Sequence, residues 1–128
     1  MKLSRVVIKV ADYRKSFEFY HDILGLKLAT SWQRKDSWGA LFSAGAGKVE
    51  IIWFPSGDGL ADCNYIIERK KIAIDFEVND IDILFTRLSG DGVRVVEEPH
   101  DVPWGLRVFS VRDPDGAVVS FIQPSDAL

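Results

Sequence analysis

The chain contains two copies of one pattern, and this repeat limits the folds open to it more than any other feature. "VVIKVADYRKSFEFYHDILGLKL" and "IAIDFEVNDIDILFTRLSGDGVRV" each hold an alternating stretch, Val-x-Asp, a helical stretch, a glycine and a second strand-like run. Val10 and Asp12 recur 68 positions later as Val78 and Asp80. A duplicated unit explains this constant offset.

The first copy predicts a strand, a helix and three further strands. Residues 3–10 alternate, so that Arg5 and Lys9 share one face and the valines and isoleucine at 6, 8 and 10 share the other. Asp12 is placed to cap a helix with an apolar stripe at helical spacing, and Gly25 favours its end. The further strands are predicted at 26–32, 38–43 and 48–54.

The second copy predicts the same order of elements. Asp75 and Glu77 share one strand face, opposite Ile74 and Phe76. Asp80 is placed to cap the next helix. Further strands are predicted at 93–97, 105–112 and 117–123, with "EEPHDVPWG" as a loop.

Each copy therefore reads β-α-β-β-β, and the chain predicts an α+β fold in a single domain over 1–128. The predicted modules are 1–54 and 71–124, with a linker at 55–70 that is rich in turn residues at its start. A sheet with one helix leaves its other face uncovered. We expect the two modules to form a curved mixed sheet around a central cleft.

Composition narrows the class of protein. The chain has 128 residues, 47% of them apolar and 27% charged, and a net charge of −3, which disfavours a nucleic-acid surface. Cys63 is the single cysteine, so no disulfide forms within the chain. No apolar run approaches the ~20 residues that span a bilayer. We expect a cytoplasmic protein with no membrane partner.

The chain resembles the vicinal oxygen chelate superfamily, the glyoxalase/bleomycin-resistance/dioxygenase group. The stretches that carry the resemblance are "VADYRKSFEFYHDILGLKL", "VNDIDILFTRL" and "PWGLRVFSVRDPDGAVVSF", which together reach over nearly the whole chain. The resemblance implies paired modules, frequent homodimers and, in the enzymes, a metal held in the cleft.

The resemblance also implies where metal ligands would stand. The family pattern places a His or Gln five residues before each Val-x-Asp, which here gives Arg5 and Ala73. It places a Glu four residues after the glycine of Asp-Pro-x-Gly, which here gives Ser120. The fourth position is Ile51 counted from Gly47, or Glu50 if the hairpin is one residue shorter.

These residue types are poor metal ligands. Divalent transition metals bind imidazole, thiolate or carboxylate groups, whereas arginine has no lone pair to donate. At best Glu50 remains, and one carboxylate does not hold a catalytic metal. We therefore expect no cofactor, with a divalent metal held by unorthodox ligands such as Glu50 and His100 as the alternative.

Alternation and aromatic content predict a ligand-binding set in the cleft. Tryptophan gives flat, rigid walls for planar ligands, and Trp53 fits the core better than the other three. Charge pairs lining a wet groove, such as Arg5 or Lys9 with Asp75 or Glu77, are the structural alternative. Acid–base chemistry by Asp75 and Glu77 has only their spacing in its favour. The predicted ligand-binding residues are Arg5, Lys9, Trp32, Trp38, Glu50, Asp75, Glu77, Trp104 and Ser120.

The histidines and the cysteine give weaker indications. His21 lies on the first predicted helix, where a surface role is expected. His100 lies in a predicted loop that could fold over the cleft and supply a base. Cys63 has no basic neighbour in the local sequence, so an ordinary free thiol is expected.

Three functions follow from these observations. The first is a metal-free binder of an amphipathic or aromatic small molecule, resembling the bleomycin-resistance branch, with the acidic residues favouring a cationic group on the ligand. The second is a metal-dependent lyase, isomerase or dioxygenase with atypical ligands. The third is a regulatory interaction module. In each case we expect a homodimer, because a small sheet domain leaves strand edges to cover.

Overall fold

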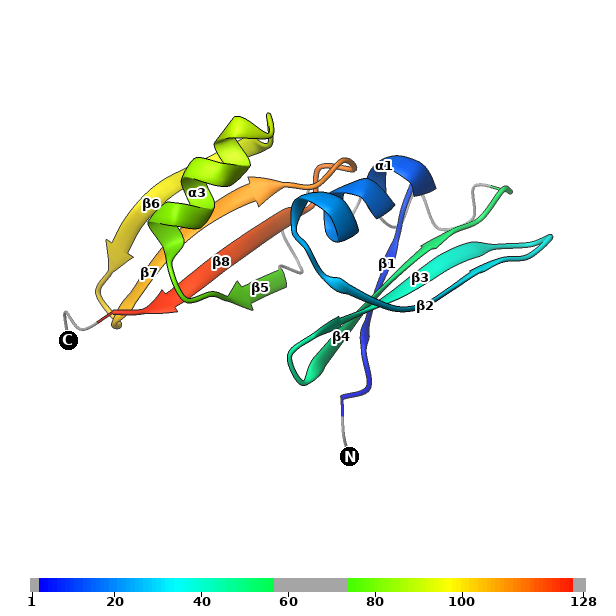
Figure 1. Ribbon diagram of the computed structural model, residues 1–128, viewed down its shortest axis with the longest axis horizontal. Coiled ribbons are helices and arrows are strands. Elements are labelled where there is room, and N and C mark those ends of the chain that lie inside the picture. The colour runs from blue at the N-terminus through cyan, green and yellow to red at the C-terminus, as the bar shows by residue number, and fades with distance from the viewer. Residues whose placement is uncertain (1–2, 57–73, 126–128) are drawn as a thin grey trace. The chain divides into compact units, whose positions relative to one another are not determined.

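The computed structural model describes residues 3–56 and 74–125, which fall into two compact units, Met1–Arg69 and Lys70–Leu128 (Figure 1). Each unit holds a four-stranded mixed sheet and one helical segment in β-α-β-β-β order. The predicted α+β class with tandem modules is confirmed. Most of the predicted linker at 55–70 lies outside the described residues, as do Cys63 and Ala73, so the module limits and the central cleft stay predictions.

The first unit begins with strand β1 (Val6–Lys9) and helix α1 (Tyr13–Phe17), which continues as a π-helical turn, η1 (Glu18–Ile23). Three strands follow in chain order. β1 runs parallel to β4, the other neighbours are antiparallel, and the order across the sheet is β1-β4-β3-β2. The three strands are β2 (Lys27–Gln33), β3 (Trp38–Ala44) and β4 (Gly47–Trp53).

The helix of the first unit forms where the sequence predicts it and covers one face of the sheet. The Asp12 carboxylate accepts a hydrogen bond from the Lys15 backbone N–H at 3.0 Å, which satisfies one of the free donors of the first turn. Gly25, with φ of 77°, ends the segment. Phe17 packs on Phe42 of β3 with ring centroids 5.7 Å apart.

Strand register decides what lies on the other face. Val6 pairs with Val49 and Ile8 with Ile51, and these side chains lie on the helix side with Phe42. Side chains alternate along a strand, so the residues between them point away from the helix. We call this side the helix-free face of the first sheet; it carries Arg5, Val7, Lys9, Lys27, Thr30, Trp32, Gly39, Leu41, Ser43, Lys48, Glu50 and Ile52.

The second unit repeats the plan with helix α3 (Ile81–Gly90), which begins at the predicted cap, Asp80. The order across its sheet is β5-β8-β7-β6, with β5 parallel to β8. Its core lies between α3 and the sheet, where Phe109 stacks on Phe121 with centroids 4.9 Å apart. The strands are β5 (Ile74–Glu77), β6 (Arg94–Val102), β7 (Leu106–Arg112) and β8 (Val118–Pro124).

The predicted end of β6 is wrong. The strand was expected at 93–97 with a loop after it, but it continues to Val102 and includes Pro99 and His100. The pairing with β7 shifts register twice, before Glu97 and before His100. Such irregularities and an edge position both tolerate proline, which has no N–H to give to a ladder. His100 is therefore a strand residue rather than part of a folded-over loop.

Within 3–56 and 74–125, no helix has the length and apolar character needed to cross a membrane.

The packing of helix on sheet predicts a large effect at Phe42, which is fully buried against Phe17, Tyr20 and His21. Phe42→Ala is expected to lower the free energy of unfolding by about 3–5 kcal/mol. Thr30→Val, on the exposed part of the neighbouring strand, serves as control and should change it by less than about 0.5 kcal/mol. Urea unfolding followed by circular dichroism measures both. A loss below about 1 kcal/mol for Phe42→Ala would contradict this account of the core.

Candidate functional site

An ion pair occupies the helix-free face of the first sheet. Arg5 Nη1 donates to Glu50 Oε1 at 2.8 Å, and the two side chains are 40% and 12% exposed. Ile51 is fully buried on the helix side. Of the two alternatives for this position, Glu50 is therefore the residue on the helix-free face. Arg5 thus has an ion-pair partner within its own unit; the alternative charge pairs of Arg5 or Lys9 with Asp75 or Glu77 would join the two units and stay predictions.

The corresponding face of the second sheet carries hydroxyl and carboxylate groups. Ser120 Oγ lies 2.8 Å from Ser110 Oγ, so the two hydroxyls share a hydrogen bond across β7 and β8. Asp75 pairs with Ser120 in register, and Glu77 pairs with Ile122 two residues further on. Both carboxylates are exposed, and within the described part of the chain neither has an ion-pair partner.

The donors at the implied ligand positions do not fit a divalent metal. The Arg5 guanidinium has no lone pair, and the Glu50 carboxylate already accepts from Arg5. Ser120 offers a neutral hydroxyl that is engaged with Ser110, and Ala73 has no donor atom. No cluster of three or more His, Cys, Asp or Glu side chains suited to a metal occurs among residues 3–56 and 74–125.

Trp32 lies on the helix-free face of the first sheet, where its ring covers Gly39 of β3. A Cβ built on Gly39 would come within 2.6 Å of Trp32 Cη2, so only glycine leaves room for the ring there. Trp32 Nε1 donates to Ser37 Oγ at 3.4 Å, and the Arg34 guanidinium carbon lies 5.8 Å from the ring centroid. The indole therefore has Gly39 on one side of its ring, a hydrogen bond to Ser37 at its edge, and the Arg34 guanidinium over the ring.

Trp38 lies on the opposite side of the same sheet. Its ring contacts Tyr13 at 5.9 Å and Trp53 at 5.0 Å between centroids, on the helix side. The Tyr13 hydroxyl donates to the Gly39 carbonyl at 3.1 Å, and burial raises the pKa of this phenol. Trp38 therefore does not share a face with Trp32 or Glu50, and its contact with a ligand stays a prediction.

The structure also describes the surroundings of Trp104, Lys9 and His100. Trp104 lies in the turn between β6 and β7 and is 70% exposed. Lys9, exposed on β1, pairs with Ile52 in register on the helix-free face. His100 Nδ1 donates to the Glu98 carbonyl at 2.8 Å, and its Nε2 lies 3.6 Å from Glu97 Oε2. Ligand contact by Trp104 and Lys9 stays a prediction, as does the alternative of His100 as a metal ligand.

Sequence reasoning missed four residues at these places: Arg34, Ser37, Gly39 and Ser110. The stretch "WQRKDSWG" held the signal for three of them, because a glycine next to a strand tryptophan can mark a close approach of another group. Ser110 gave no signal, since its partner Ser120 is identified only by the register of β7 and β8.

These features define an α+β protein of two repeated modules, each with one sheet face covered by its helix and the other carrying polar groups. The chain belongs to the Glyoxalase/Bleomycin resistance protein/Dioxygenase superfamily, whose model matches residues 2–121.

The chain is also similar to individual relatives and to a solved structure. The chain is 35% identical over 125 residues to the uncharacterized protein YraH of Bacillus subtilis, covering 90% of this chain and 92% of that one. It is 31% identical over 129 residues to a probable lactoylglutathione lyase of Synechocystis sp., covering 98% and 97%. The structure of TnmS3, an antibiotic binding protein from Streptomyces sp. CB03234, matches with a TM-score of 0.68 at 24% identity, covering 98% and 99%.

The ion pair predicts an energetic coupling between Arg5 and Glu50. Arg5→Ala leaves the largely buried Glu50 carboxylate without its cation and should lower the free energy of unfolding by about 1–3 kcal/mol, less than for a fully buried pair. Adding Glu50→Gln should restore at least half of that loss, because a neutral amide needs no counter-ion. A double-mutant cycle by urea unfolding measures the coupling. Strictly additive losses would contradict the pair.

Proposed function

We propose that the protein binds a small organic molecule on the helix-free faces of its sheets without using a divalent metal. The observation that carries the proposal is the Arg5–Glu50 ion pair at 2.8 Å. It joins two positions at which the family resemblance places metal ligands, so a fixed positive charge stands where the enzymes would hold a cation.

The paired arginine can itself recognise a ligand. Only Nη1 of Arg5 bonds to Glu50, and the side chain remains 40% exposed, so the other N–H groups of the guanidinium are not used in this ion pair. Such groups bind carboxylate and phosphate oxygens. Asp75 and Glu77 would accept from hydroxyl or amino groups of a ligand. An amphipathic ligand held by such contacts is sequestered rather than transformed.

The comparisons support a binding protein of this architecture. TnmS3 is described as an antibiotic binding protein, and at 24% identity it contributes the fold alone. The fold therefore occurs in a protein whose described role is to bind an antibiotic. A homodimer and a cytoplasmic location remain predictions alongside this proposal.

A metal-dependent lyase is the second candidate, because a relative at 31% identity is named a probable lactoylglutathione lyase. For that activity Glu50 would have to exchange Arg5 for a metal, and further donors would have to come from residues outside the implied ligand positions. An enzyme built on these residues would need a ligand set different from the family pattern.

Metal content separates the two candidates. Protein purified without an affinity tag, from medium supplemented with nickel, zinc, manganese and iron, is expected to hold less than about 0.1 equivalent of any of them by mass spectrometry, since Arg5 repels cations. Stoichiometric metal that survives dialysis and leaves on substitution of Glu50 by Gln would overturn the proposal.

Arg5→His gives the matched gain-of-binding test. The substitution frees the Glu50 carboxylate and adds an imidazole, and is expected to raise zinc affinity by about tenfold or more. Arg14→His, at an exposed helix position, is the control and should leave zinc affinity unchanged. Equal affinities in the two variants would show that Arg5 does not govern metal binding.

A further inference from the structure

The Trp32 ring is fixed by two contacts, with Gly39 below it and with Ser37 at its edge. The ring lies flat over a backbone that lacks a Cβ, and Ser37, itself only 8% exposed, accepts from its Nε1. Trp32 remains half-buried, so part of the indole meets solvent. An aromatic ring that is fixed in place and partly exposed loses little conformational entropy when a ligand stacks on it.

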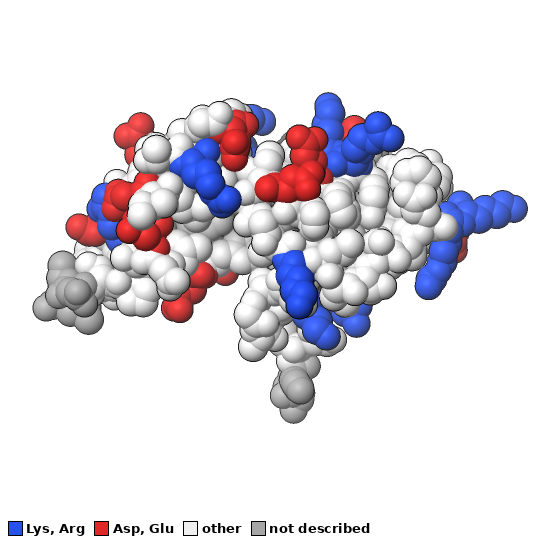
Figure 2. Space-filling model, viewed as in Figure 1, with Lys and Arg blue, Asp and Glu red and all other residues white. Residues whose placement is uncertain are grey.

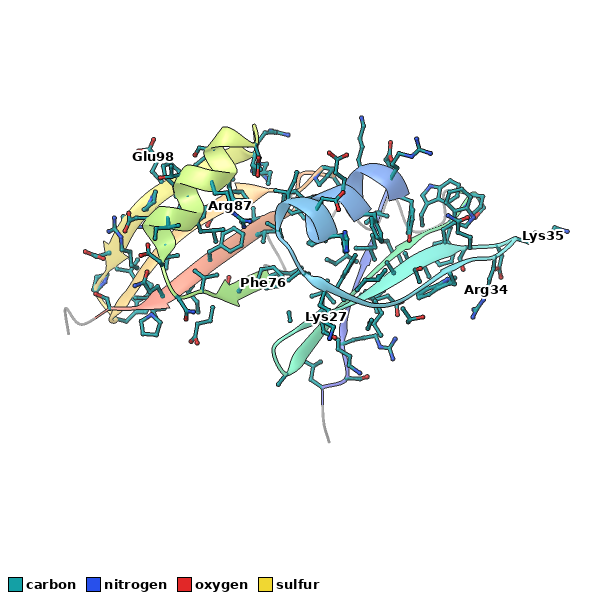
Figure 3. All side chains as sticks on the ribbon, viewed as in Figure 1. Lys27, Arg34, Lys35, Phe76, Arg87 and Glu98 are labelled. Atoms are coloured by element: carbon teal, nitrogen blue, oxygen red, sulfur yellow. The ribbon has the colours of Figure 1, made fainter. Side chains whose placement is uncertain are left out.

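Arg34 supplies a cation at the same place. Its guanidinium lies 5.8 Å from the Trp32 ring centroid, and no carboxylate of the described residues is within ion-pair distance of it. Figure 3 shows Arg34 and Lys35 at the turn that joins β2 to β3, with side chains that point outward. The arginine thus lies over the indole ring, and no carboxylate of the described residues neutralises it.

The helix-free face of the first sheet, on which Trp32 lies, has an excess of positive charge, like Arg34. Among the residues that the structure describes, the helix-free face of the first sheet carries four cationic side chains and one carboxylate, Glu50, which is paired with Arg5. A surface with such an excess attracts anions. The four cationic residues are Arg5, Lys9, Lys27 and Lys48.

We propose that Trp32 and Arg34 form a subsite for a planar aromatic ring that bears an anionic group. The inference deepens the proposed function and rests on it. The ligand ring takes the place of the Arg34 guanidinium over the exposed part of the indole, and its carboxylate or sulfonate accepts hydrogen bonds from that displaced guanidinium. This reverses the polarity expected from the acidic residues alone, because Glu50 is neutralised by Arg5.

The probe is 2-naphthoate, followed by the indole N–H signals of the ¹⁵N-labelled full-length protein. We expect saturable binding below about 1 mM with the largest shift at the Trp32 signal, which disappears in Trp32→Leu. Cyclohexanecarboxylate, which is not planar, and 2-naphthalenemethanol, which is not charged, should each bind at least about fivefold more weakly.

Two variants test separately the contact of Trp32 with Gly39 and the positive charge of Arg34. Gly39→Ala adds a Cβ that displaces the Trp32 ring and should weaken 2-naphthoate binding by about tenfold, while the protein stays folded by circular dichroism. Arg34→Gln should weaken 2-naphthoate by about fivefold and leave 2-naphthalenemethanol unchanged. Arg14→Gln, at an exposed helix position, is the matched control and should bind as the unaltered protein does.

The failure of this subsite and the failure of the proposed function give different results. Absence of saturable 2-naphthoate binding, or binding that shifts another indole while Trp32→Leu has no effect, overturns the subsite. Tightly held metal in the purified protein overturns the proposed function whatever the probe does.

Discussion

The burial of one face of each sheet beneath its own helix is the constraint on which the rest of the structure depends. In the first unit Tyr20 and Phe42 are fully buried between helix and sheet, and in the second Phe85 packs edge-on against Phe109 at 5.5 Å. Because side chains alternate along a strand, fixing the apolar face also fixes which residues stand on the other one. A shift of one residue in β4 would bury Glu50 and expose Ile51.

That constraint gives the helix-free faces their chemistry, and the two units differ in it. Residues 3–56 contain eight Lys and Arg against five Asp and Glu, whereas residues 74–125 contain four against ten. Figure 2 shows this difference as more blue over the first unit and more red over the second. The described part of the first unit therefore has an excess of cationic side chains, and the one carboxylate among the described residues of its helix-free face, Glu50, is paired with Arg5. Ser120 takes the place in the second sheet that Glu50 takes in the first. Two neutral hydroxyls, those of Ser110 and Ser120, therefore stand where the first sheet has a carboxylate.

Features that depend on local sequence were predictable. Asp12 and Asp80 cap the helices as expected, since the cap requires only a carboxylate at the right place before the first turn. Strand faces followed from alternation within each strand. The extension of β6 through Pro99 was not predictable in this way, because it depends on register shifts against β7.

Features that depend on turn geometry and on strand pairing could be predicted from the sequence only in part. Trp32 and Trp38 stand on different strands, so the turn between them decides their relative facing, and they lie on opposite sides of the sheet. Glu50 and Ile51 stayed open for the same reason, because the pairing of Ala44 with Gly47 sets the hairpin length. The Arg5–Glu50 bond itself joins residues 45 positions apart, and only the parallel pairing of β1 with β4 brings them together.

The most direct test of the central claim is a crystal structure of the protein grown with nickel or zinc, with anomalous data collected at the absorption edge of the metal. The account predicts Arg5 bonded to Glu50 and no anomalous peak within coordination distance of the Glu50 carboxylate. A strong peak coordinated by Glu50, with Arg5 turned away, would contradict it.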